Sequence, residues 1–276
     1  MSFFDAVLQF LKARMQTPTG YGWFHLLSFA VVIALTVFLC VKFRDCSDTV
    51  FRRILLIGWI VIILFEVYKQ VAYVGFQGEP GNYHWDYQWY AFPYQFCSTP
   101  HYILPFIIFL KPGKVRNACM AFMTTFAFFA GAAVLFYPGD VFVSQIGINI
   151  QTMVHHGSQV VFGIFIAVYN RHRFGIKWYL SSLPVFAAMV AGAMLLNWLV
   201  PIWFSGEQTF NMFFVSWRFP CTLPVLSMFY GKLPYPLFLL LYLVGFAIAA
   251  LVIFGITFGI LKLVQRLTAK PAQTAE

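Results

Sequence analysis

Cys97 and three histidines are the residues of this sequence best suited to covalent chemistry. His101 follows Cys97 by four residues in one apolar stretch, and the neighbouring His155 and His156 lie in another. A thiolate is a strong nucleophile, and a nearby imidazole can take its proton and return it, so these residues could form and break an acyl thioester. The alternative is that the histidines only form hydrogen bonds between helices and that the thiol only fills space.

A second polar group lies in a different apolar stretch, where Glu66 and Lys69 are three residues apart. Ionisable side chains are costly in a membrane and usually face the interior of a helix bundle, where they mark functional sites. The pair is either a structural ion pair or part of a proton path. Further polar residues lie near these groups along the chain and are predicted to support or bind: Tyr94, Ser98, Thr152, Gln159 and Asn211.

Cys97, His101, His156 and Glu66 are also residue types that bind zinc. They come from three separate stretches, however, and no zinc-type cysteine or histidine spacing connects them. We therefore expect no metal and no cofactor.

The composition requires a membrane around most of the chain. Hydrophobic residues make up 61% and charged residues only 10%, and the mean hydropathy is +0.77. A soluble domain needs more charge to cover its surface. The basic excess of +9 lies in short loops, so it indicates orientation in a membrane rather than binding to nucleic acid. The expected partners are membrane phospholipids, and the sequence indicates no particular protein partner.

The positions of the apolar stretches predict an all-α, polytopic bundle of about seven transmembrane helices. We treat residues 1–276 as one integral membrane domain, with an interfacial segment at 1–20 and a short cytoplasmic tail at 264–276. The predicted spans are 22–42, 54–76, 91–110, 118–137, 149–169, 178–201 and 234–263.

The loops after the first, third and fifth spans and the tail hold most of the Lys and Arg residues. The loops at 77–90 and 138–148 hold none. Because cytoplasmic loops are rich in basic residues, this pattern predicts an external N-terminus and a cytoplasmic C-terminus in a multi-pass protein of the cell membrane.

Prolines in the third span indicate a cavity. Pro100 and Pro105 would each remove a helical hydrogen bond, freeing the carbonyls of Phe96 and His101. Such backbone groups are tolerated in a membrane only when they are buried in protein or line a cavity. We therefore predict a cavity beside Cys97.

With these residues in place, the chain resembles the YwaF-like bacterial integral membrane family, which is related to the eukaryotic transmembrane protein 164. The resemblance covers roughly 45–265 and rests on Glu66, on the motifs FPYQFC (92–97) and HHG (155–157), and on TFNMFF (209–214) and GKLPYPLF (231–238).

The eukaryotic relatives are described as acyltransferases that move fatty acyl chains between phospholipids through an acyl-cysteine. The resemblance implies that Cys97 is the nucleophile and that His156, rather than His155, is its base. Gln95 stands where bacterial members often carry a histidine, and His101 could compensate from the other side.

Three functions remain open on the sequence. The leading hypothesis is a membrane-embedded lipid acyltransferase or acyl hydrolase with Cys97 and a histidine base in the outer half of the bilayer. The second is a proton-coupled transporter of a small molecule or lipid that uses Glu66, Lys69 and His156. The third is a non-catalytic membrane scaffold or receptor subunit.

Overall fold

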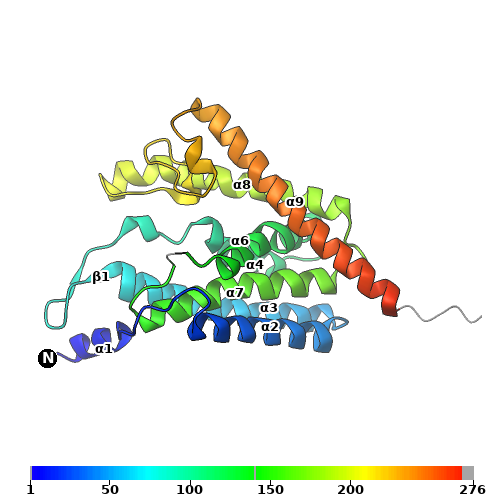
Figure 1. Ribbon diagram of the computed structural model, residues 1–276, viewed down its shortest axis with the longest axis horizontal. Coiled ribbons are helices and arrows are strands. Elements are labelled where there is room, and N and C mark those ends of the chain that lie inside the picture. Colours follow the sequence, from blue (N-terminus) through cyan, green and yellow to red (C-terminus); the bar gives the residue numbers. More distant parts are fainter. Residues whose placement is uncertain (1, 140, 269–276) are drawn as a thin grey trace, which may run out of the picture.

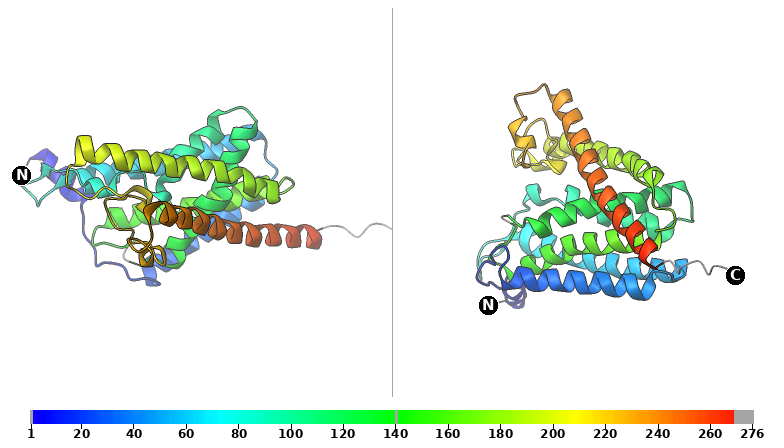
Figure 2. Two further views of the ribbon diagram at one scale, coloured as in Figure 1. Left: turned by 90° about the horizontal axis from the view of Figure 1, so that it is seen from above. Right: turned by 45° about the vertical axis from the view of Figure 1, so that its right-hand side comes forward.

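The computed structural model describes residues 2–139 and 141–268 and is a bundle of helices (Figure 1). Helices α2, α3 and α7 form one side of the bundle, α4 and α6 lie next to them, and α8 lies on the far side (Figures 1 and 2). The long α9 crosses the others obliquely. The α-helices are α1 (Phe3–Leu11), α2 (Trp23–Phe43), α3 (Asp48–Tyr68), α4 (Thr99–Phe109), α5 (Lys114–Phe122), α6 (Phe128–Phe136), α7 (Ile146–Tyr169), α8 (Ile176–Val200) and α9 (Tyr235–Thr268).

Irregular helical segments interrupt or extend this framework. Two short strands pair antiparallel outside the bundle, β1 (Phe76–Gln77) and β2 (His84–Trp85). The π-helical segments are Lys69–Gly75, Met123–Ala127 and Pro201–Ser205, and the 3-10 turns are Trp89–Ala91, Phe96–Ser98, Met212–Phe214 and Leu226–Met228.

Within the described residues, five helical stretches are long and apolar enough to cross a membrane. They correspond to the first, fourth, fifth, sixth and seventh predicted spans, with ends that shift by a few residues. The multi-pass helical fold is thus confirmed, whereas the count of seven spans and the orientation of the termini stay predictions. The stretches are Trp23–Phe43, Lys114–Phe136, Ile146–Tyr169, Ile176–Ser205 and Tyr235–Leu267.

The second predicted span corresponds to α3 and the π segment that follows it. The helix begins earlier than predicted because the side chain of Ser47 accepts a hydrogen bond from the Val50 amide and caps the first turn. The switch to a π-helix at Lys69 comes one turn after Glu66. Irregular turns of this kind are frequent at functional sites.

The third predicted span is helical only from Thr99 to Phe109. Pro100 lies in the first turn of α4, where a proline costs no helical hydrogen bond. The prediction that Pro100 frees the Phe96 carbonyl is therefore wrong, since that carbonyl accepts hydrogen bonds from the amide and the hydroxyl of Thr99.

Pro105, by contrast, lies inside α4. The carbonyl of His101, four residues earlier, accepts a hydrogen bond at 2.9 Å from the indole Nε1 of Trp59 on α3. The predicted loss of a helical bond at this carbonyl fits this arrangement, because a side chain from another helix supplies the donor.

At the N-terminus, Ser2 and Asp5 cap α1 through reciprocal hydrogen bonds. Phe3 and Phe10 on this helix are exposed, and Lys12 donates a hydrogen bond to the carbonyl of Phe76 in β1. The exposed aromatic face is compatible with the interfacial segment predicted at 1–20.

The opposite end of the bundle carries the basic loops. Arg171, after α7, forms an ion pair with Asp45 in the loop after α2. Arg116 on α5 forms one with Asp48 at 2.5 Å. The loops predicted to be cytoplasmic therefore lie at one end of the molecule. α9 continues to Thr268, so the predicted tail begins as helix, and the rest of it (269–276) lies outside the described residues. Its cytoplasmic location stays a prediction.

Candidate functional site

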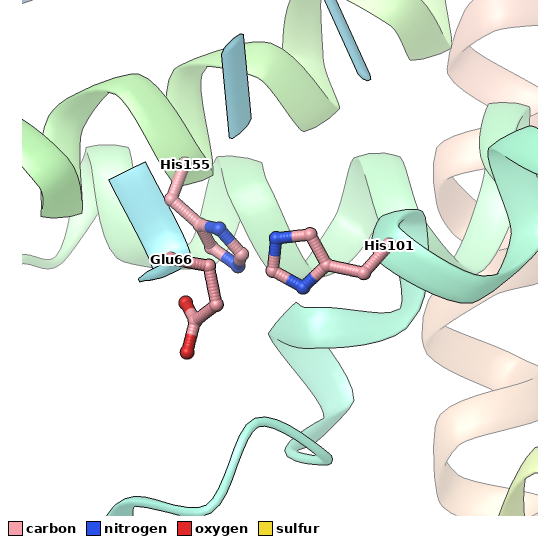
Figure 3. Close-up of side chains that lie close together, drawn as sticks. All are labelled: Glu66, His101 and His155. Atoms are coloured by element: carbon pink, nitrogen blue, oxygen red, sulfur yellow. The ribbon is translucent and has the colours of Figure 1, made fainter. Parts of the chain in front are cut away.

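Three buried side chains from three helices meet inside the bundle: Glu66 of α3, His101 of α4 and His155 of α7 (Figure 3). Each offers one nitrogen or oxygen atom, and these atoms lie within 4.8 Å of one another. The exposed fractions are 6%, 6% and 4%. The two imidazole rings face each other with centroids 4.9 Å apart.

Glu66 is held by donors on both sides of its carboxylate. Lys69 Nζ lies 2.9 Å from Oε1, and Gln70 Nε2 donates to the same oxygen at 2.7 Å. Gln151 Nε2, from α7, donates to Oε2 at 3.3 Å. The expected ion pair between Glu66 and Lys69 is therefore present, one turn apart on a largely buried face.

Cys97 lies in the 3-10 turn that leads into α4, and its side chain is partly buried. Two side chains of α7 donate to its backbone carbonyl: His155 Nε2 at 2.9 Å and Gln159 Nε2 at 2.7 Å. Among the described residues, no hydrogen bond connects the Cys97 thiol with a histidine ring. The close contact between α7 and this turn is thus made through the Cys97 backbone.

His156 has a different environment from its neighbour. Its Nδ1 lies 2.8 Å from the carbonyl of Thr152, one turn earlier on α7. An N–H at Nδ1 makes this contact a hydrogen bond and leaves Nε2 with a free electron pair. A close approach of α6 fixes the backbone here, since a Cβ atom on Gly131 would lie only 2.5 Å from the His156 carbonyl oxygen.

Several predicted residues lie elsewhere. Tyr94 donates from its hydroxyl to the Met189 carbonyl of α8 at 3.3 Å. Asn211 bonds the backbone of its own loop, accepting from the Ser216 amide and donating to the Phe219 and Pro220 carbonyls.

The predicted third span, 91–110, treated Tyr94, Cys97, Ser98 and His101 as residues of one continuous helix. Residues 94–98 are not α-helical, so helical spacing does not place these side chains together. Ser98 is buried in the 3-10 turn.

Three contributors were not found from the sequence: Gln151, Trp59 and Tyr87, whose hydroxyl donates to Gln70 Oε1 at 2.5 Å. Gln151 carried a usable signal, because it precedes His155 by four residues and lies on the same helix face. Trp59 lies on a helix face, and Tyr87 in a loop, where the sequence shows no polar pattern.

An apolar groove of about 640 Å³ lies between α2, α3 and α7. Aliphatic and aromatic side chains line most of it, with Ser28 and Ser158 as polar exceptions. From α7 it includes Val154 and Gly157, which flank the two histidines in sequence. A lipid chain has the chemistry that such a surface accepts.

The metal set considered from the sequence does not form as such. The side chains that converge are Glu66, His101 and His155, so His155 takes the place assigned to His156, and Cys97 is not a member.

The model of the TMEM164 family matches residues 20–258 of the chain. The match includes the five sequence features on which the resemblance rests. No curated protein and no solved structure matches the chain.

Proposed function

The chain belongs to the TMEM164 family of membrane proteins, and from this premise we propose that it transfers or hydrolyses lipid acyl chains through a cysteine, Cys97. The observation that carries the proposal is the double contact of α7 with the Cys97 backbone. His155 and Gln159 hold its carbonyl at 2.9 and 2.7 Å, which fixes the backbone that carries the thiol at the start of α4.

In the proposed reaction the Cys97 sulfur attacks the ester carbonyl carbon of a phospholipid. His156 Nε2 takes the thiol proton and passes it to the departing oxygen, so a lysolipid leaves and a thioester remains. The hydroxyl of an acceptor lipid, or water, then attacks the thioester. His156 takes that hydroxyl's proton and returns it to the sulfur.

His156 suits this role because the Thr152 carbonyl engages Nδ1 and leaves Nε2 free. His155 already contacts the Cys97 carbonyl through Nε2, so we assign it a positioning role. The apolar groove beside α7 offers a place for an acyl chain.

The test is to incubate the protein in lipid nanodiscs with a phospholipid that carries an alkyne-tagged acyl chain. We expect hydroxylamine-sensitive label on Cys97, none in Cys97→Ala, and unchanged labelling in Cys40→Ser and Cys119→Ser. In His156→Ala, labelling should slow by about 10²-fold or more. Label that persists in Cys97→Ala would contradict the proposal.

The buried ion pair favours a second candidate, a proton-coupled transporter. Glu66 and Lys69 lie 2.9 Å apart inside the bundle, next to two buried histidines. This function predicts uptake into proteoliposomes that requires a pH gradient and is lost in Glu66→Gln. Uptake that does not depend on the pH gradient, or the absence of any uptake, would rule out a proton-coupled transporter.

For the orientation we propose an external N-terminus and a cytoplasmic C-terminus in the cell membrane. Supporting this, the Arg-rich loops lie at one end of the molecule and contact each other through Arg171 and Asp45. A cysteine introduced at Gly81 should react with a membrane-impermeant maleimide in intact cells, and one at Gly113 only after lysis. Labelling at Gly113 in intact cells, with labelling at Gly81 only after lysis, would show the opposite orientation.

A further inference from the structure

The side chains of Glu66, His101 and His155 form a cluster whose composition and burial call for an occupant. They come from three separate helices, and each is more than nine-tenths buried. Figure 3 shows the two imidazoles facing each other, with the Glu66 side chain beside the His155 ring. Side chains of this kind are expensive to bury unless they are bonded.

His101 is the least satisfied member. Both of its ring nitrogens are buried, and neither makes a hydrogen bond of good geometry among the described residues, although backbone groups of Ile62 and Ser98 approach the ring. A neutral imidazole has one N–H and one free electron pair, and burial shields both from bulk solvent. Its own carbonyl is engaged by Trp59, which fixes the backbone that carries the ring.

One ring nitrogen of His155 is hydrogen-bonded, and the other is not. Its Nε2 lies 2.9 Å from the Cys97 carbonyl, which fits an N–H donor, and its Nδ1 is buried without a partner. The neutral ring that donates from Nε2 has its free electron pair at Nδ1. Metal-binding histidines are commonly oriented in this way, by donating from one nitrogen and coordinating through the other.

Glu66 completes the donor set. The Lys69 and Gln70 side chains both bond Oε1, whereas Oε2 has, within 2–139 and 141–268, only the longer contact at 3.3 Å with Gln151. The carboxylate is thus oriented by surrounding donors, as ligating carboxylates are, and one oxygen keeps coordinating capacity.

We propose that Glu66, His101 and His155 bind a divalent transition-metal ion, with zinc as the best chemical match. Two imidazoles and one carboxylate are a ligand set of zinc sites that keep a fourth position open. The donor atoms lie within 4.8 Å of one another, and a tetrahedral zinc site needs separations of roughly 3.3 Å, so small side-chain movements close the site. The ion competes with the Lys69 ammonium for the same carboxylate.

The proposed metal ligands include neither the Cys97 thiol nor His156, the two groups that react in the proposed acyl transfer. His155 takes part in both proposals, because it donates to the Cys97 carbonyl through Nε2 and would bind the metal through Nδ1. His101 has a role in the metal site alone.

The test uses the full chain in lipid nanodiscs, stripped with a chelator, loaded with ZnCl2 and desalted, with metal measured by mass spectrometry. We expect about one zinc ion per chain and at least tenfold lower occupancy in His101→Ala, His155→Ala and Glu66→Gln. The neighbouring His156→Ala and the exposed His172→Ala are the matched controls and should keep the metal.

Co²⁺ bound in place of zinc gives a readout that needs no variant. Visible absorption bands as intense as those of four-coordinate Co²⁺ should appear in the unaltered chain and saturate at one equivalent. Lys69→Met removes the competing cation and should tighten Zn²⁺ binding severalfold. Absence of stoichiometric metal in the unaltered chain, or zinc retained in both His101→Ala and His155→Ala, would overturn the proposal. Labelling of Cys97 after chelation reports on acyl transfer separately.

Discussion

The side chain of Gln95 forms two hydrogen bonds with the backbone of the turn that begins at Asn211. Its Nε2 donates to the Asn211 carbonyl and its Oε1 accepts from the Phe213 amide, each at 3.1 Å. Phe213 has a positive φ of 56°, a conformation that a bulky residue adopts only when its surroundings enforce it. The segment that precedes Cys97 therefore determines the shape of a loop more than a hundred residues later.

Gln95→Ala removes both hydrogen bonds and leaves a backbone amide and carbonyl without partners. We expect a loss of about 1–3 kcal/mol in the free energy of unfolding. Gln88→Ala is the control, because the Gln88 side chain bonds only Asp86 in its own loop. Unfolding in detergent, followed by near-UV circular dichroism, measures both. Equal losses in the two variants would contradict the role of Gln95.

The ion pair of Glu66 and Lys69 predicts strong coupling. Glu66→Ala leaves a largely buried ammonium without its partner and should cost about 3–5 kcal/mol, while the double variant with Lys69→Ala should cost less than the sum of the single ones. The exposed pair of Arg14 and Glu79 is the control, with an expected coupling below about 1 kcal/mol. A double-mutant cycle of unfolding free energies measures both pairs, and additive effects at Glu66 and Lys69 would argue against the pair.

Gly131 allows α6 to approach the histidines of α7. A Cβ there would lie 2.5 Å from the His156 carbonyl oxygen and 2.6 Å from Gln159 Cβ, so Gly131→Ala forces the helices apart and should cost about 1–3 kcal/mol. Gly255→Ala in α9 meets nothing within 4 Å and should be nearly neutral. Thermal unfolding in nanodiscs compares the two, and a neutral Gly131→Ala would show that α6 adjusts freely.

Acid should weaken the loop contact at the basic end of the bundle. The hydrogen-bonded guanidinium of Arg171 lowers the pKa of Asp45 below its usual value. A lowered folded-state pKa means that the contribution to stability is complete above about pH 4, the pKa of an unfolded Asp, and is lost as the pH falls through the folded-state pKa.

We therefore expect Asp45→Asn to lower the Tm slightly at pH 6 and to match the unaltered chain at the most acidic pH. The effect is small because Asp45 is exposed. Arg171→Gln should flatten the same pH dependence, and a difference between Asp45→Asn and the unaltered chain that grows toward acid pH would contradict the prediction.

The sequence predicted the spans best where helices are regular. The long apolar stretches of α2, α7 and α9 lie within a few residues of their predicted positions, because length and composition suffice in a membrane. The segment before Cys97 was predicted less well. The third span was predicted as one long helix that contains Pro100, whereas the helix starts only at Thr99.

Three side chains that meet inside the bundle were singled out from the sequence, but their contacts were not predicted. Glu66, His101 and His155 were all singled out, because ionisable residues in apolar spans are conspicuous. Which of His155 and His156 faces Glu66 could not be predicted. Their side chains point about 100° apart around α7, and only the packed neighbours determine which one faces Glu66. The donor from Trp59 is likewise invisible in sequence, because it depends on how two helices are placed side by side.

The bond between Trp59 and the His101 carbonyl also has a mechanical consequence. Because Pro105 has no amide hydrogen to donate, the His101 carbonyl bonds the Trp59 side chain instead. This hydrogen bond links α3 to α4. Sliding of α4 along α3 would break this bond and leave the His101 carbonyl without a hydrogen-bond partner in an apolar interior. We therefore expect the two helices to travel as one body. The chain between them, from Phe76 to Phe96, contains no α-helix, so we expect it to move independently of the pair.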